Sequence, residues 1–232
     1  MNDIFKQLYT FLPEPKKSFT GETVIITGSN TGLGKEAARH IARLGASQLI
    51  LAVRSLDKGE AARKDIEQST GCGKDVIKVW HLDMASYESV LKFADRAQRE
   101  LQRVDVLLAN AAIATGTFTI VEGNESTLTV NVISTFLLVL AMLPKMKETA
   151  KAFSTSPVIT ITSSGAHKGA EFPAKSAPDG RIFATMNDPE GFDFGRYPLS
   201  KLLEIFCLKH IGEHHSKLPV TINDVDPGLC HS

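Results

Sequence analysis

Tyr197 and Lys201 are the residues whose types and spacing most clearly permit acid–base chemistry. They open a helical pattern near the end of the chain, in the run Tyr-Pro-Leu-Ser-Lys. Four residues make about one helical turn, so a phenol and an ammonium group would lie on one helix face. The ammonium favours the phenolate form of its neighbour, and such a pair can give a proton to a carbonyl oxygen or take one back. The alternative is an ordinary amphipathic helix start with a packed tyrosine and an exposed lysine.

A glycine-rich segment near the other end of the chain is suited to phosphate binding. Residues 27–34, Thr-Gly-Ser-Asn-Thr-Gly-Leu-Gly, follow an apolar run and precede a helical pattern. Gly28 would allow a tight turn, Gly32 the approach of a pyrophosphate to the backbone, and Gly34 close helix–strand packing. The helix N-terminus would supply free N–H donors, so the context predicts nucleotide binding rather than a turn without a ligand. The other predicted contacts in the segment are Ser29, Asn30 and Leu33.

Strand and helix patterns alternate along the whole chain. Apolar runs rich in β-branched residues predict strands at 22–28, 48–54, 76–83, 104–111, 158–164 and 220–225. Helical periodicity predicts helices at 32–44, 57–68, 86–101, 125–147 and 197–215. The alternation predicts an α/β fold, a Rossmann-like doubly wound parallel sheet with helices on both faces and six strands present.

The composition is that of one globular domain. The chain has 232 residues, of which 43% are hydrophobic and 22% are charged. We expect a single dinucleotide-binding and catalytic domain over residues 1–232, with residues 1–20 as an N-terminal extension and residues 165–196 as a long loop insertion. Basic and acidic residues number 26 each, so no net positive field favours nucleic acid as a partner.

Two further observations bear on the location of the protein. The apolar stretch 128–143 is interrupted by polar residues and is shorter than the roughly 20 residues of a spanning helix, so we expect a buried core helix and no membrane span. The three cysteines form no disulfide or zinc pattern, which favours a reducing compartment. The first 20 residues, broken by Pro13 and Pro15, do not resemble a secretory signal, so the cytoplasm is the default expectation. The histidines show no metal-ligand spacing, and no metal site is predicted.

The spacing Thr-Gly-x-x-x-Gly-x-Gly together with Tyr-x-x-x-Lys resembles the short-chain dehydrogenase/reductase family, over about residues 20–228. The resemblance implies that Tyr197 is the acid/base and that Lys201 favours its phenolate and holds the cofactor ribose. It implies that Ser164, at the end of the fifth predicted strand, orients a substrate carbonyl. It also implies that Asn131 supports a proton relay through a water linked to the lysine.

The same resemblance assigns further cofactor contacts. Asp83 would hold the adenine ring, and Asn110 would lie beside the cofactor ribose. Pro227 and Gly228 resemble a Pro-Gly turn near the nicotinamide. The family pattern Asn-Ala-Gly is here Asn-Ala-Ala, with Ala112 in place of the glycine.

Arg54, at the end of the second predicted strand, bears on the choice of cofactor. An acidic residue at this place would bond the ribose 2′-OH of NAD, and the run Val-Arg-Ser has none. An arginine can bind a 2′-phosphate with two parallel hydrogen bonds, so we expect NADP(H). The alternative is a surface ion pair of Arg54 with Asp57 or Glu60.

A long insertion points to one branch of the family. Ser164 and Tyr197 are 33 residues apart, as in the branch with retinol-dehydrogenase-like proteins and reductases of secondary metabolism. Residues 165–196 would either line a cleft for a large apolar substrate or form a surface insertion. The expected function is hydride transfer between NADP(H) and a carbonyl or alcohol group of a lipophilic small molecule.

Two other functions compete with hydride transfer; one is suggested by the end of the chain and the other by its helices. The family normally continues past Gly228 with a helix and a seventh strand, so we expect a truncated chain. A protein that binds cofactor but is catalytically impaired or regulatory is therefore the first alternative. The second is a structural subunit, because the helices predicted at 125–147 and 197–215 pair subunits in related folds, giving a homodimer or homotetramer.

Overall fold

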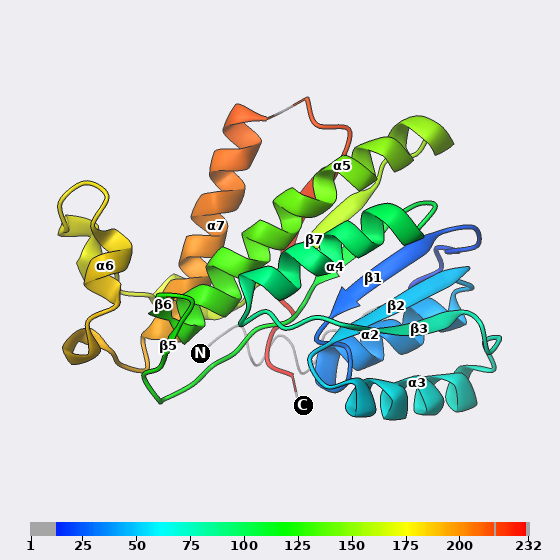
Figure 1. Ribbon diagram of the computed structural model, residues 1–232, viewed down its shortest axis with the longest axis horizontal. Coiled ribbons are helices and arrows are strands. Elements are labelled where there is room, and N and C mark those ends of the chain that lie inside the picture. The colour runs from blue at the N-terminus through cyan, green and yellow to red at the C-terminus, as the bar shows by residue number, and fades with distance from the viewer. Residues whose placement is uncertain (1–12, 216, 231–232) are drawn as a thin grey trace.

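Six parallel strands form the central sheet of the computed structural model, which describes residues 13–215 and 217–230. The strands are β1 (Thr23–Thr27), β2 (Gln48–Val53), β3 (Ile77–His81), β4 (Val106–Ala109), β7 (Val158–Thr162) and β8 (Thr221–Val225). Their order in the sheet is β3-β2-β1-β4-β7-β8, and every neighbouring pair is parallel. The order reverses between β1 and β4, which confirms the predicted doubly wound α/β fold (Figure 1).

Helices cover both faces of the sheet. They are α2 (Gly32–Arg43), α3 (Leu56–Thr70), α4 (Tyr87–Glu100), α5 (Thr135–Phe153) and α7 (Arg196–His214). Successive side chains of a strand point to opposite faces, so Val24 and Ile26 pack with α2 and α3 while Ile25 packs with α4, α5 and α7. Phe19, ahead of β1, also packs against the cluster beneath α2, and most of the predicted 1–20 extension lies outside the described residues.

The predicted strands run past the observed strands at the carboxyl edge of the sheet. Gly28 follows the last residue of β1, Arg54 follows β2, and Ser163 and Ser164 follow β7. These residues leave the hydrogen-bonded ladder and turn over the sheet edge, where parallel α/β sheets bind ligands. At this edge the boundary errors therefore fall on residues that form the site.

The helix predicted at 125–147 begins close to the predicted residue but ends later, at Phe153. Residues 126–127 are helical, the π-helical segment η1 (Leu128–Ser134) follows, and α5 continues to Phe153 with Pro144 inside the helix. By length and composition the continuous helix Leu128–Phe153 could cross a membrane. However, 72% of its most apolar stretch is buried inside the fold, as expected of a core helix.

The insertion at 165–196 contains several short helical turns beside the main domain (Figure 1). These are η2 (Gly165–Gly169), η3 (Pro173–Ser176), α6 (Ile182–Met186) and η4 (Pro189–Gly191). The insertion is fastened to a small hairpin formed by β5 (Ile120–Val121) and β6 (Asn124–Glu125). The Asn187 side chain accepts the Glu125 N–H at 2.8 Å and donates to the Gly123 carbonyl at 3.0 Å.

Gly34→Ala tests the close approach of α2 to the sheet. A Cβ atom at Gly34 would lie 2.6 Å from both the Asn110 Nδ2 and the Gly28 carbonyl oxygen. We expect the substitution to lower the free energy of unfolding by about 1–3 kcal/mol, the cost of overpacking, in urea denaturation. Gly212→Ala in α7 is the control, because no atom lies within 4 Å of its added methyl. It should raise stability by about 0.5–1 kcal/mol, and equal effects at the two positions would refute the packing argument.

Candidate active site

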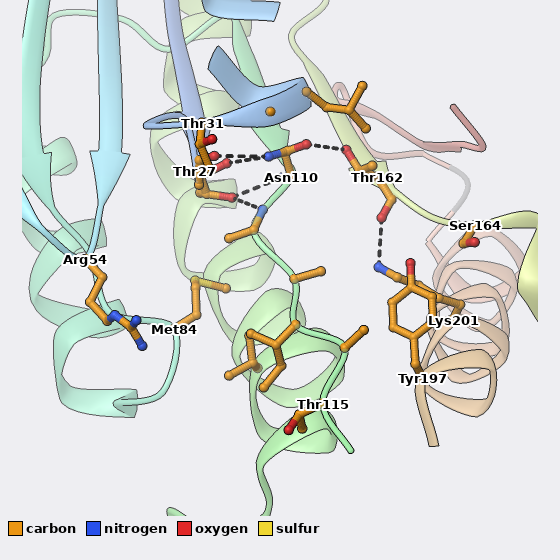
Figure 2. A pocket seen from close by; sticks show the side chains of 18 of the residues that line it. Thr27, Thr31, Arg54, Met84, Asn110, Thr115, Thr162, Ser164, Tyr197 and Lys201 are labelled. Atoms are coloured by element: carbon orange, nitrogen blue, oxygen red, sulfur yellow. Dashed lines mark hydrogen bonds between the residues drawn. The ribbon is translucent and has the colours of Figure 1, made fainter. Parts of the chain in front are cut away.

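A cavity of about 960 Å³ lies over the carboxyl edge of the sheet, where the chain order reverses. It collects residues from the glycine-rich turn, from the ends of β2, β3, β4 and β7, and from α7. Most of the predicted site residues line it, namely Gly28, Asn30, Gly32, Leu33, Arg54, Asp83, Asn110, Ser164, Tyr197, Lys201, Pro227 and Gly228. The topology therefore joins the predicted phosphate-binding turn and the predicted acid–base pair in one space (Figure 2).

Three predicted residues lie outside the cavity wall. Ser29 is fully buried and its hydroxyl donates to the Ile26 carbonyl at 2.9 Å, so it closes the turn from within. Gly34 faces Asn110 and provides the close helix–strand packing expected of it. Asn131 lies in η1, behind the wall, and acts on the site through its hydrogen bonds.

A chain of hydrogen bonds crosses the sheet edge from the glycine-rich turn to Lys201. The Asn110 amide donates to the Thr27 carbonyl at 3.1 Å, and its oxygen accepts the Thr162 hydroxyl at 3.4 Å. The Lys201 ammonium donates to the Thr162 carbonyl at 2.9 Å. Thr27 adds a hydroxyl that accepts the backbone N–H groups of Asn110 and Ala111 (Figure 2).

Tyr197 and Lys201 lie on one face of α7, as their spacing predicts. The Lys201 Nζ lies 5.8 Å from the Tyr197 ring centroid, and the phenol and the ammonium point to the same side of the cavity (Figure 2). Tyr197 is half-buried and Lys201 is buried. A phenol and an ammonium so arranged can exchange a proton with a group bound in the cavity.

Two serines follow β7 at the cavity, of which Ser164 is half-buried and Ser163 is buried. The Ser164 hydroxyl accepts the Ala166 N–H at 3.2 Å, which leaves its own hydrogen for an acceptor in the cavity. The Ser163 hydroxyl is buried without a hydrogen-bond partner. Ser164 is therefore placed to orient a carbonyl oxygen.

Asn131 ties three segments together through its side chain. Its amide donates to the Ile113 carbonyl at 2.9 Å and to the Ser200 hydroxyl at 3.0 Å, while its oxygen accepts the Ile113 N–H at 2.8 Å. Ser200 in turn donates to the Tyr197 carbonyl at 2.8 Å. Asn131 thus fixes the start of α7 against the loop after β4, and both of its amide N–H groups are engaged.

The sequence prediction missed Thr27, Thr162 and Glu204. Thr27 and Thr162 act through hydrogen bonds between strands, which sequence patterns do not reveal. Glu204 is 1% exposed and forms an ion pair with Lys201 at 2.8 Å. Its signal in the sequence is an acid inside an apolar run, three residues after Lys201 on the same helix. Burial raises the pKa of Glu204 to about 7.

The residues around the cavity fit a dinucleotide. Gly28 has φ +64° in the turn and Gly32 has φ +54° as the first residue of α2, so both positions favour glycine. Asp83 lies at the other end of the wall, where one carboxylate oxygen accepts the Ala85 N–H at 2.9 Å. Arg54 is exposed at the end of β2 and, among the described residues, forms no ion pair with Asp57 or Glu60.

Residues 165–196 contribute nothing to the wall of this cavity in the described structure. Arg196, the last of them, is buried, and its guanidinium lies 3.7 Å from the Glu125 carboxylate. It also donates to the Met186 carbonyl at 3.0 Å. Of the two hypotheses for the insertion, the geometry favours a surface insertion that anchors the start of α7.

Comparison with known proteins agrees with this geometry. The family model for short chain dehydrogenases matches residues 22–176. A short chain dehydrogenase/reductase of Cryptosporiopsis sp. (strain 8999) is 57% identical over 237 residues, covering 100% of this chain and 73% of the relative. A short chain dehydrogenase of Emericella nidulans is 41% identical over 236 residues, covering 99% of this chain and 74% of the relative.

Solved structures share the fold. A short chain dehydrogenase from Escherichia coli CFT073 complexed with NADPH superposes with a TM-score of 0.69 at 23% identity, covering 92% of this chain and 79% of the other. A short-chain type dehydrogenase/reductase from Mycobacterium marinum superposes with a TM-score of 0.70 at 22% identity, covering 91% and 74%. With the family match over most of the chain and the fungal relative at 57% identity, this protein belongs to the short-chain dehydrogenase/reductase family of oxidoreductases.

Proposed function

We propose that the protein transfers a hydride reversibly between NADP(H) and a carbonyl or alcohol group of a lipophilic small molecule. One observation carries the proposal: the glycine-rich turn, Arg54, Tyr197, Lys201 and Ser164 all border one cavity. The family supports an oxidoreductase that uses a nicotinamide cofactor. The Escherichia coli relative in complex with NADPH supports the phosphorylated cofactor.

The chain offers contacts along the whole length of such a cofactor. The turn at Gly28 and Gly32 and the N-terminus of α2 would hold the pyrophosphate, and Asp83 the adenine. The exposed Arg54 guanidinium would bind the 2′-phosphate, since no carboxylate at the end of β2 repels it. Further contacts would come from Asn30, Leu33, Asn110, Lys201, Pro227 and Gly228. When bound, the nicotinamide supplies or accepts the hydride.

The side chains that transfer the proton belong to α7. During reduction the Tyr197 hydroxyl donates its proton to the carbonyl oxygen, and during oxidation the phenolate takes it back. The Lys201 ammonium stabilises the phenolate by its charge, and the Ser164 hydroxyl donates a hydrogen bond that orients the carbonyl. Asn131 supports the relay by fixing α7 through Ser200.

Apolar side chains on the cavity wall support a lipophilic substrate. The apolar residues are Ala112, Ile113, Ala114, Val121, Val130 and Leu229, and the wall also carries the hydroxyl groups of Thr115, Thr119 and Ser126. The apolar part gains free energy by covering hydrocarbon, while the hydroxyl groups can bond to polar groups of such a substrate. The fungal short chain dehydrogenases among the relatives are consistent with a role in secondary metabolism.

Arg54→Asp tests the choice of cofactor. The substitution removes a charge-assisted hydrogen-bond donor and adds a repulsive charge, so we expect NADPH affinity to fall about ten- to a hundredfold. NADH affinity should stay the same or improve. Thermal-shift titration with each cofactor measures both affinities, because a ligand bound only by the folded state raises the Tm. Arg181→Asp makes the same charge change on the exposed insertion and should alter neither the NADPH affinity nor the NADH affinity. An unchanged NADPH affinity in Arg54→Asp would rule out the role proposed for Arg54.

Tyr197→Phe tests the acid–base assignment. Loss of the hydroxyl should lower NADPH-dependent reduction of a panel of apolar ketones and aldehydes by about 10²–10⁴-fold. The thermal shift with NADPH should persist, because the ring and the cavity remain. Tyr87→Phe, at the N-terminus of α4, removes the same group away from the cavity and should leave turnover intact. NADPH binding by the unsubstituted chain without turnover on any member of the panel would favour the hypothesis of a regulatory cofactor-binding protein.

A further inference from the structure

Glu204 is a buried carboxylate that the proposed mechanism leaves unused. It lies on α7 three residues after Lys201, and the two side chains are 1% and 2% exposed. Its Oε1 accepts from the Lys201 Nζ at 2.8 Å, and its Oε2 is buried without a hydrogen-bond partner. Burying a carboxylate is costly unless it is paired, so this residue depends on Lys201.

The geometry at Lys201 shows what the carboxylate does. An ammonium group has three N–H donors. One is taken by the Thr162 carbonyl at 2.9 Å and one by Glu204 at 2.8 Å. With two donors taken, the third is left for a group in the cavity that Lys201 and Tyr197 line.

We propose that Glu204 is a positioning residue for Lys201, which holds the ammonium in place and offsets part of its charge, thereby setting how readily Tyr197 gives up its proton. The inference rests on the proposed function for the roles of Tyr197 and Lys201. A carboxylate next to the ammonium weakens the field that favours the phenolate. Glu204 therefore weakens the stabilisation of the Tyr197 phenolate by Lys201, while its hydrogen bond keeps the Lys201 ammonium in position.

Among the described residues, Lys201 is the one cationic side chain that forms an ion pair with Glu204. On α7 the Cys207 thiol is the other titratable group near it, and on β8 the Asp224 carboxylate faces it. Helix η1 has no titratable side chain. In η2 the titratable side chains are His167, whose Nδ1 contacts the Ser164 carbonyl, and Lys168.

Glu204 ionises at a lower pH than a free phenol does, so the effect of its charge on Tyr197 can be measured. Burial and Asp224 raise the pKa of Glu204, and Lys201 lowers it, with a net value of about 7. A free phenol ionises near ~10, so Glu204 carries its charge at the higher pH where a tyrosine is titrated. Removing that charge should then favour the phenolate of Tyr197.

Glu204→Gln is the informative variant, since glutamine keeps an oxygen for the Lys201 N–H and removes the charge. The chain has three tyrosines, so the ultraviolet absorbance titration with and without Tyr197→Phe isolates the Tyr197 phenolate by difference. We expect Glu204→Gln to move its midpoint to lower pH by about one unit, as for one charge acting through a partly screened interior. A purely structural role would leave the midpoint where it is.

Glu213→Gln is the matched control. It removes the same charge from the same helix, at an exposed residue that pairs with Lys209 at 3.8 Å. It should leave the Tyr197 midpoint unchanged. An unmoved midpoint in Glu204→Gln, or one that moves to higher pH, would overturn the proposal.

A second measurement covers the case in which Glu204→Gln does not fold. Carboxyl-carbon NMR of the chain labelled at its glutamates should show one signal that shifts as Tyr197 ionises and that loses this shift in Tyr197→Phe, because the proposal couples the Glu204 charge to Tyr197 through Lys201. If no glutamate signal responds to the ionisation of Tyr197, the inference fails. Neither titration needs cofactor or substrate. The inference about Glu204 can therefore fail while the Tyr197→Phe turnover assay supports the proposed function. The proposed function can likewise fail in that assay while the titrations support the inference.

Discussion

The side chain of Asn110 joins the strands whose ends form the site. It bonds to Thr27 at the end of β1 and to Thr162 at the end of β7, and Thr162 in turn accepts from Lys201. Because β1, β4 and β7 are neighbours in the sheet, these bonds span the edge without a gap. These bonds fix the separation between the glycine-rich turn and the lysine, the two parts of the proposed cofactor site.

Much of the fold and of the site could be predicted because its signals are local. The glycine turn is specified by adjacent residues, and the strand before it and the helix after it are contiguous in sequence. Tyr197 and Lys201 share a helix face because four residues make about one turn. The ends of parallel strands meet at one edge, so Arg54 and Ser164 are expected on the wall of one cavity once the alternation of strands and helices is recognised.

What escaped prediction depends on contacts between distant parts of the chain. Asn131 was predicted as a member of a proton relay, yet its partners, Ile113 and Ser200, lie 18 and 69 residues away. The π-helical start of the core helix belongs to the same network, because Asn131 lies within it and bonds to Ile113 and Ser200. Glu204 has a sequence signal, but only the packing of α7 decides whether an acid at that position is buried or solvated.

The insertion between β7 and α7 is held at its end and largely exposed in its middle. Asn187 and Arg196 fasten it to the β5–β6 hairpin, whereas residues 175–181 are mostly exposed and lie away from the cavity wall. Lengthening an exposed loop costs little free energy, because the closure term grows only with the logarithm of its length. The turn at Pro178 to Gly180 is therefore a natural attachment point for a fluorophore or a surface tether, from which the mouth of the cavity stays open to solution.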